Sequence, residues 1–429
     1  MKSTRLLLAF AALPLLLSAC TKVPAGDRRV PAASDVQVAF GLDGATKGLS
    51  PLTTLPVLAQ QDFSVSAWYT PEGETFCGPE SESLPYFTNH RFGYLKGADE
   101  DDSYANHAWQ GVRRTSASLS ENPVYYPLDG TLSYFCYAPY REAAGGPALP
   151  DFTADFPDFA PASDIALGDP VDDADVIARL PGYLPGSPLL CVTPAASAAD
   201  QADFLAAPPV LDKSRLDAGG QLSLDFSKHR MTQVEFAFNY KGTLANTADI
   251  QESVRVTGIT VRDVIGSRYF YFTEEGPYEV GCSWSDAVSP AAPADAAAYF
   301  PQASYTLSAA GGDLKTYSLG GLPEASGNNH ETVSTPLGIL YLLPQTHRIG
   351  ARLEIAYSIV EQHGVARASE VVSYELAETP AWPEGKRVVY LITLDIPARG
   401  VVGLSAVITD WLDAGNSNHP GEEAPELFY

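Results

Sequence analysis

The sequence predicts an all-β protein assembled from β-sandwiches. Apolar residues recur with a period of two along most of the 429 residues, as at 36–40, 63–67 and 353–359. This alternation is typical of strands that have one buried and one solvent-facing side. The 35 glycines and 34 prolines interrupt these runs, and few windows show the 3.6-residue period of a helix. Many short strands separated by turns favour sandwiches.

The composition allows substantial hydrophobic cores, since 45% of the residues are apolar. The formal net charge is −25. A surface this negative argues against nucleic acid and anionic lipid as partners, because both bind basic patches. We expect no transmembrane helix, since no second long apolar run follows the one near the N-terminus.

The first twenty residues carry a signal for export. Lys2 and Arg5 precede an apolar run at residues 6–17, and Leu-Ser-Ala-Cys follows at 17–20. This order is typical of a lipoprotein signal peptide, which predicts removal of residues 1–19 and acylation of Cys20. The alternative is an ordinary signal-peptidase site beside an unmodified Cys20. The acyl chains would hold the protein outside the cytoplasm, with residues 20–35 as a tether.

We place a domain boundary near the middle of the chain. Residues 195–220 are rich in Ala, Pro and Asp, and strand-like alternation resumes directly after them. The sequence therefore predicts an N-terminal sandwich domain at 36–208 and a C-terminal one at 209–412. A polar tail follows at 413–429. Its role is open: the tail could shield the terminal strands, attach to a neighbour or do neither.

The last two predicted strands form a hairpin. Residues 388–396 are strongly apolar, residues 397–400 form a turn, and residues 401–411 make the second strand. One face of this second strand carries a continuous apolar set: Val402, Leu404, Ala406 and Ile408. The hairpin could pack on its own domain or be lent to a neighbouring molecule.

The chain shows no pattern typical of a catalytic or metal site. Besides Cys20 it has four cysteines without CxxC spacing, which makes a zinc site improbable and leaves disulfide pairing open: Cys77, Cys136, Cys191 and Cys282. The seven histidines are dispersed, and 52 carboxylates make paired acids uninformative. We predict no enzyme activity, no cofactor and no metal.

Two tryptophans are candidates for ligand contact. Trp109 and Trp284 lie in polar stretches, where an exposed ring could stack on a sugar. The other three fall within or beside strand patterns and are predicted to be core residues: Trp68, Trp382 and Trp411.

Several short motifs follow one another in a characteristic order. They are Asp-Phe-Ser-Val-Ser-Ala-Trp at 62–68, Tyr-Tyr-Pro-Leu-Asp-Gly at 125–130, Leu-Ser-Leu-Asp-Phe-Ser-Lys-His at 222–229, Leu-Tyr-Leu-Leu-Pro-Gln at 340–345 and Trp-Pro-Glu-Gly-Lys at 382–386. With the lipoprotein signal and Ala-Thr-Lys-Gly at 45–48, this order resembles the fimbrillin family, the subunits of type V pili in anaerobic Gram-negative bacteria. The resemblance covers most of the mature chain.

The resemblance implies two transthyretin-like β-sandwich domains in tandem and export as an outer-membrane lipoprotein at the cell surface. It also implies assembly with other pilus subunits into a fimbrium. In stalk subunits a protease cuts after an Arg behind the first strand, and the C-terminal strands of another subunit fill the resulting groove. Here the exchangeable first strand would contain Val36, Val38 and Phe40, and residues 401–409 would be the donor strand.

One position departs from this pattern. Lys47 stands where the family often has the Arg that is cut. Either a different protease acts at Lys47, or the subunit stays uncut and serves as an anchor or accessory protein. Lys47 could also be an ordinary solvated turn residue.

Two functions compete on the sequence. The first is a structural pilus subunit that assembles by strand donation, is anchored through lipid on Cys20 and takes part in adhesion. The alternative is a surface lipoprotein that does not polymerise and binds a glycan or a host or bacterial surface ligand through its loops. A glycosidase is a distant third.

Overall fold

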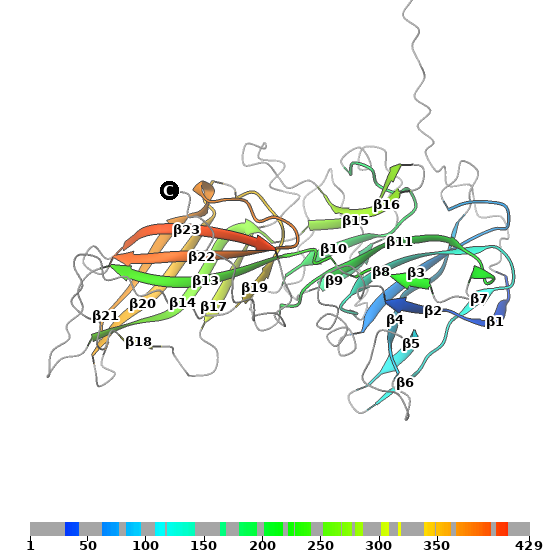
Figure 1. The fold of residues 1–429 in the computed structure, drawn as a ribbon, viewed down its shortest axis with the longest axis horizontal. Coiled ribbons are helices and arrows are strands. Elements are labelled where there is room, and N and C mark those ends of the chain that lie inside the picture. Colours follow the sequence, from blue (N-terminus) through cyan, green and yellow to red (C-terminus); the bar gives the residue numbers. More distant parts are fainter. Residues whose placement is uncertain are drawn as a thin grey trace, which may run out of the picture.

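The computed structural model describes residues 31–42, 62–76, 83–95, 108–115, 118–141, 164–168, 180–194, 201–217, 222–226, 228–241, 252–266, 268–276, 279–285, 302–308, 316–318, 339–347, 349–361, 366–395 and 400–410. Strands make up most of these residues, which contain a 3₁₀ turn (η5, Leu376–Glu378) but no α-helix. The all-β prediction is confirmed. In Figure 1 the sheets follow one another along the long axis of the molecule.

The largest sheet belongs to the N-terminal half. Its order is β11 (Leu205–Lys213), β8 (Thr131–Ala138), β3 (Phe63–Thr70), β4 (Leu84–Tyr94), β5 (Trp109–Arg114), β2 (Ala39–Leu42) and β12 (Leu222–Leu224), and β6 (Leu119–Glu121) also pairs with β5. Beside it, β1 (Ala33–Gln37) pairs with β7 (Tyr125–Pro127).

A second sheet joins strands from both halves of the sequence. Its order is β16 (Glu279–Trp284), β15 (Arg268–Gly276), β10 (Leu189–Thr193) and β9 (Asp164–Gly168). The central pair places Leu190 opposite Phe270. The side chains of this sheet pack against the outer face of β3 and β8, where Phe135 meets Phe272 at a ring separation of 4.9 Å.

The C-terminal half is a sandwich of two sheets. One has the order β19 (Ile339–Leu342), β13 (Thr232–Lys241), β22 (Lys386–Asp395) and β23 (Gly400–Asp410). The other has the order β17 (Gln302–Ser308), β14 (Glu252–Ile265), β20 (Arg352–Glu361) and β21 (Ala366–Glu375), with β18 (Thr316–Ser318) also paired to β14. One hydrophobic cluster fills the space between them, with Phe236 and Tyr390 from the first sheet facing Ile259 and Ile355 from the second.

Strand β3 is buried on both faces, whereas the alternation at 63–67 predicts one solvent-facing side. Phe63, Val65 and Ala67 pack into the first cluster, and Trp68 packs into the cluster beneath the second sheet. Ser64 is fully buried, and its hydroxyl donates to Asn89 Oδ1 at 2.6 Å. The prediction of a half-buried strand is wrong here because a second sheet covers the polar face of β3. The buried Ser64 hydroxyl keeps a hydrogen-bond partner in the side chain of Asn89.

The predicted boundary between residues 208 and 209 falls inside β11, which is one strand of the largest sheet. Strand β12 follows the boundary in sequence and pairs with β2. Met231 and Leu343, from the C-terminal half, enter the cluster beneath the second sheet. The two halves therefore share a core, and the division into two tandem transthyretin-like domains stays a prediction.

Candidate functional site

The leading segment, residues 33–42, forms two short strands, although the sequence predicts one strand at 36–40. β1 pairs antiparallel with β7. β2 lies between two other strands, antiparallel to β5 and parallel to β12. The chain changes partners at Val38, whose backbone N–H donates to the Val124 carbonyl at 2.9 Å. Because the partner changes at Val38, the backbone hydrogen bonds of residues 33–42 do not form one continuous ladder.

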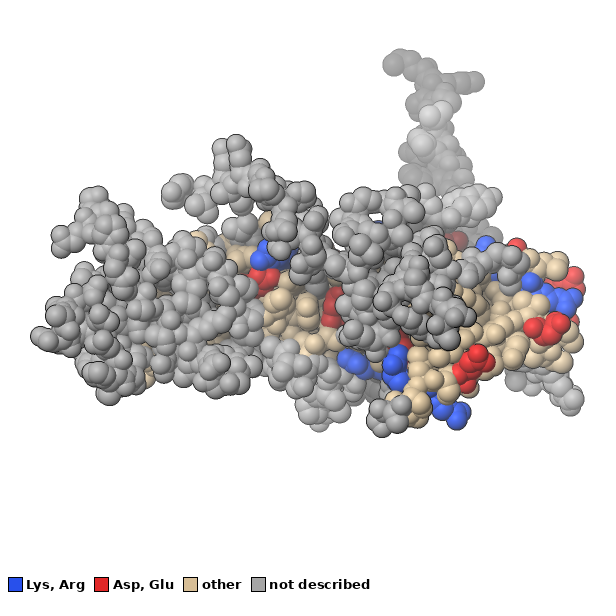
Figure 2. Space-filling view, turned by 60° about the horizontal axis from the view of Figure 1, so that its bottom comes forward, with Lys and Arg blue, Asp and Glu red and all other residues tan. Residues whose placement is uncertain are grey.

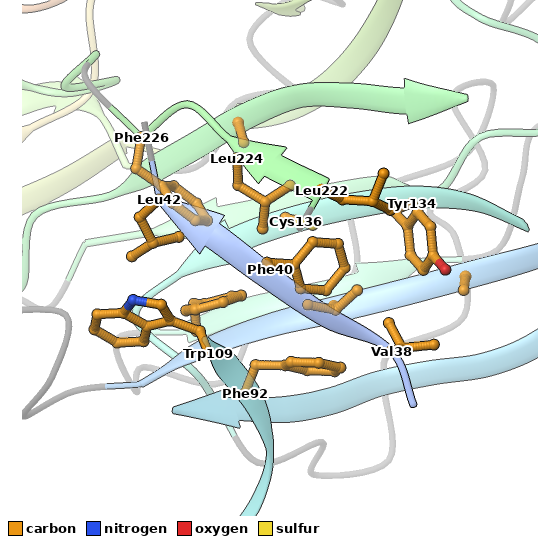
Figure 3. Close-up of a cluster of buried hydrophobic side chains, with 14 of the residues drawn as sticks. Val38, Phe40, Leu42, Phe92, Trp109, Tyr134, Cys136, Leu222, Leu224 and Phe226 are labelled. Atoms are coloured by element: carbon orange, nitrogen blue, oxygen red, sulfur yellow. The ribbon is translucent and has the colours of Figure 1, made fainter. Parts of the chain in front are cut away.

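The side chains of the leading segment enter the first hydrophobic cluster. Val38 and Phe40 are fully buried, and Leu42 is 5% exposed. The Phe40 ring meets Phe92 and Tyr134 edge-on at centroid distances of 5.3 and 5.2 Å. Figure 3 shows Phe40 at the centre of these side chains, with Val38 and Leu42 on either side. Val36, in β1, is partly buried against the same cluster.

Loss of the leading segment would open a slot bounded by strand edges. β5 and β12 would lose the backbone partner that now lies between them, and β7 would lose β1. Unpaired edges of this kind accept an added strand. The slot, which we call the exchange slot, would be lined by apolar side chains: Phe92, Trp109, Tyr134, Leu222 and Leu224.

A buried ion pair fixes the start of β3 beside this slot. Asp62 precedes β3 with a φ of 56°, and its side chain is 0% exposed. Arg114 donates from Nε and Nη2 to the two Asp62 carboxylate oxygens, each at 2.6 Å, and this hydrogen bonding raises the pKa of Arg114. A Cβ on Gly93 would lie 2.5 Å from Asp62 Oδ1, so residue 93 must lack a side chain. Asp62 is the first residue of the motif at 62–68, but no pattern in the sequence predicts its pairing with Arg114.

The terminal strand β23 lies at the edge of its sheet. It pairs antiparallel with β22 from Asp395–Gly400 to Lys386–Asp410. Two side chains of the predicted donor face, Leu404 and Ala406, are only partly buried against the C-terminal core. Ile408 is 39% exposed. The side chain of Val402 lies outside the described residues.

Strand β22, in contrast, is interior. It pairs with β13 in parallel over nine residues and with β23 on its other side. Its inward side chains are essentially inaccessible to solvent: Val388, Tyr390, Ile392 and Leu394. Of the predicted terminal hairpin, only β23 could leave without dismantling the sandwich.

The two tryptophans predicted to contact a ligand are core residues. Trp109 is 0% exposed in β5, where its ring lies 5.8 Å from Phe63. Trp284 is 6% exposed in β16, and its Nε1 donates to the Arg230 carbonyl at 2.8 Å. The prediction of exposed rings is wrong because the polar neighbours in sequence occupy the opposite faces of the same strands.

Two of the four cysteines are buried free thiols. Cys136 is 1% exposed beneath the exchange slot, and burial raises its pKa. Cys191 is 7% exposed in the second sheet, and burial raises its pKa to about 12. Cys282 Sγ accepts a hydrogen bond from Arg230 Nη2 at 2.8 Å. Cys77 lies outside the described residues.

Three of the predicted features cannot be placed. Cys20, Lys47 and the tail at 413–429 lie outside the described residues. Within the described ranges, no group of three or more His, Cys, Asp or Glu residues could hold a metal ion. The same ranges contain no helix that is long and apolar enough to cross a membrane.

Among solved structures, a fimbrial protein from Bacteroides vulgatus ATCC 8482 aligns at 16% identity and a TM-score of 0.44, over 87% of this chain and 99% of that one. A candidate cell adhesion protein from Bacteroides uniformis ATCC 8492 aligns at 14% identity and a TM-score of 0.34, over 89% and 100% of the two chains. A search of curated proteins gives no match. A family model described as fimbrillin-like matches residues 92–411, about three quarters of the sequence. The chain belongs to this fimbrillin-like family.

Proposed function

We propose that the protein is a fimbrial subunit that assembles by strand exchange: the leading segment leaves the exchange slot, and β23 of another copy enters it. Family membership supports a fimbrial protein of the cell surface. The observation that carries the exchange mechanism is the contrast between β2, which is buried between two strands, and β23, which lies half-buried at an edge.

The lengths of the two segments agree. The leading segment comprises the five residues of β1, Val38 and the four residues of β2, which makes ten, and β23 has eleven residues. A seated β23 could therefore replace both the contact with β7 and the contacts with β5 and β12. Its alternate apolar residues would enter the slot at the two-residue spacing that Val38, Phe40 and Leu42 now use.

The change in burial favours exchange. Filling the slot with three apolar side chains contributes roughly 1.5–3 kcal/mol each. Backbone hydrogen bonds on both sides of the strand add about 1 kcal/mol each. Leu404 and Ala406 are only partly buried in their own sandwich, so they would become more buried in the exchange slot of another copy. Ordering of the donor opposes this gain, and the remainder suits a long-lived polymer.

Cleavage behind the leading segment would act as the trigger. Lys47 follows the end of β2 by five residues, so a cut there separates β1 and β2 from the rest of the chain. The protease would have to accept lysine. A subunit that is not cut would keep its slot closed and stay at the outer membrane through lipid on Cys20 as an anchor. A role of the assembled fimbrium in adhesion is part of the proposal.

The test is cleavage at a single introduced site. We would replace residues 45–49 with the recognition sequence of a site-specific protease, cut the folded protein and follow its size by light scattering. We expect oligomers to form after cleavage, with residues 33–42 released. A cut chain that keeps this segment bound and stays monomeric contradicts the proposal.

The donor is tested in the same assay with a matched pair of variants. Leu404→Asp places a charge on the partly buried face of β23 and should abolish oligomers. Thr409→Asp introduces the same charge at an exposed position of β23 and should leave them unchanged. Equal effects of the two substitutions would show that β23 is not the donor.

A further inference from the structure

Phe40 fills the centre of the exchange slot. Its ring is fully buried and meets Phe92 and Tyr134 edge-on. Its backbone lies between Trp109 of β5 and Leu222 of β12. We call the place of this ring the central position. A strand that replaces the leading segment must put a large apolar side chain there, because the cost of a cavity grows with its volume.

The two residues on either side of Phe40 in the sequence are small. Ala39 and Gly41 point to the opposite face of β2, where both are half-buried. The leading segment therefore presents a small, a large and a small residue in succession at the centre of the slot. A donor strand that repeats this order fills the central position and leaves the opposite face of the sheet unchanged.

Strand β23 contains the same order around Leu404, which lies between Gly403 and Ser405. The order is the same in both directions along the chain. The match therefore holds whether the donated strand runs parallel or antiparallel to the segment that it replaces. The other apolar residues of the donor face have a β-branched neighbour in sequence: Val401 beside Val402, and Val407 beside both Ala406 and Ile408.

Size and charge exclude the other registers. Ala406 at the central position would leave most of the volume of the ring empty. Ile408 there would carry Asp410, two residues further on, among the apolar side chains that line the slot, where a charge is costly. Figure 2 shows charged side chains of the described N-terminal half on its surface. Val402 there would put Gly400 at the next inward position and leave that position unfilled.

We propose that Leu404 of a second copy of this chain determines the specificity of the exchange slot by taking the central position that Phe40 vacates. The proposal rests on strand exchange as the proposed function, and it assigns the register of the seated donor. Leucine is smaller than phenylalanine, so the donor fills the central position less completely than the leading segment does. The covalently tethered leading segment therefore excludes β23 of other copies until the chain is cut.

The test measures binding of a labelled peptide of residues 400–410 to the cut chain by fluorescence anisotropy. The receiving chain carries the protease site at 45–49 and Leu404→Asp, so that its own β23 does not compete. We expect the Leu404→Phe peptide to bind about tenfold more tightly than the unsubstituted peptide, because the added ring restores the edge-on contacts of the central position. The matched Ala406→Phe peptide adds the same ring at the next inward position and should gain no affinity.

A cross-link tests the register independently of affinity. Phe40 and Leu222 are paired residues of neighbouring strands, and both side chains enter the first hydrophobic cluster. A Leu404→Cys peptide should therefore form a disulfide with a receiving chain that carries Leu222→Cys. The Ala406→Cys peptide should react more slowly. Peptide mapping identifies the linked residue, and Cys136→Ala in the receiving chain removes the thiol of the same cluster.

The register and the exchange itself fail in different ways. A gain for the Ala406→Phe peptide that equals or exceeds the gain for Leu404→Phe, or preferential cross-linking of the Ala406→Cys peptide, would place another residue at the central position and overturn the proposal. The absence of any gain for Leu404→Phe would overturn it as well. If the unsubstituted peptide did not bind at all, strand exchange would be contradicted, and the assignment of Leu404 would be lost with it.

Discussion

The leading segment and the terminal strand occupy opposite kinds of position in their sheets. Strand β2 is held on both sides, and Val38 and Phe40 are completely buried. Strand β23 is held on one side, and its inward residues reach only the margin of the core. In the proposed exchange β2 must leave, although it joins β5 to β12 in its sheet. The exchange slot of the uncut chain therefore stays filled until the chain is cut behind β2. The donor strand β23 is easier to release, because it is paired on one side only.

The largest effect on this comparison should come from Phe40→Ala. The substitution removes a fully buried ring and both of its edge-on aromatic contacts, and we expect a loss of about 3–5 kcal/mol in the free energy of unfolding of the uncut protein. Denaturant unfolding of the whole uncut chain, compared with the unsubstituted protein, measures this loss. If Phe40→Ala lowered the free energy of unfolding by only about 1 kcal/mol, as expected for a substitution in an edge strand, β2 would not be an integral strand of its sheet.

The stability of the C-terminal sandwich should fall in acid, because a buried histidine packs beside β22. Burial lowers the pKa of His347 to about 4, and its ring packs on Trp382 at 4.5 Å, beside Tyr390 of β22. The unfolded chain binds this proton at its ordinary pKa near 6.5, so stability is lost as pH falls from about 6.5 to 4, by up to about 3 kcal/mol. Denaturant unfolding at several pH values between 6.5 and 4 measures this loss of stability.

A variant separates His347 from the other titrating groups. His347→Gln removes the ionisable ring and should flatten the pH dependence between 6.5 and 4, although it also lowers stability at neutral pH. An unchanged slope would show that groups other than His347 cause the loss of stability in acid.

The sequence predicts the strands better than their surroundings. Alternation correctly predicts the strand at Ile355–Tyr357, where Ile355 and Tyr357 meet the core and Ala356 between them is more exposed. It also predicts the strand at Val234–Phe236, although Glu235 between them is buried as well and pairs with Arg387. It fails at Ser64, where a second sheet covers the polar face, because periodicity describes one strand and not what packs on it. Trp109 is misassigned for a different reason, since its polar neighbours in sequence lie on the opposite face of β5.

The candidate site depends on contacts between distant parts of the sequence. The parallel pairing of β2 with β12 joins Phe40 to Leu222, and the Asp62–Arg114 pair joins residues 52 positions apart. No local pattern encodes either contact. The alternation at Val36, Val38 and Phe40 predicts a strand. It does not predict that this strand lies between β5 and β12.

A smaller effect is expected for Leu404→Ala in β23. The side chain is only partly buried at an edge, so we expect a loss of about 1 kcal/mol in the stability of the uncut protein. The same substitution should weaken oligomer formation more strongly, since Leu404 would be fully buried in the slot. Comparison of denaturant unfolding with light scattering separates the two effects. A greater loss in the monomer than in the oligomer would show that Leu404 is not buried in the slot and would contradict the donor role of β23.

The last prediction involves no change in stability and follows the slot directly. Cys136 lies in the cluster that Phe40 covers, and Cys191 lies in β10 of the second sheet, away from the slot. In the uncut chain both thiols should resist alkylation, because burial excludes the reagent and raises both pKa values. After cleavage and loss of residues 33–42, peptide mapping should find Cys136 alkylated and Cys191 still protected. Protection of Cys136 should return when β23 of another copy fills the slot, which separates exchange from simple local unfolding. Alkylation of both thiols together would mean that the N-terminal half unfolds on cleavage and that no slot exists.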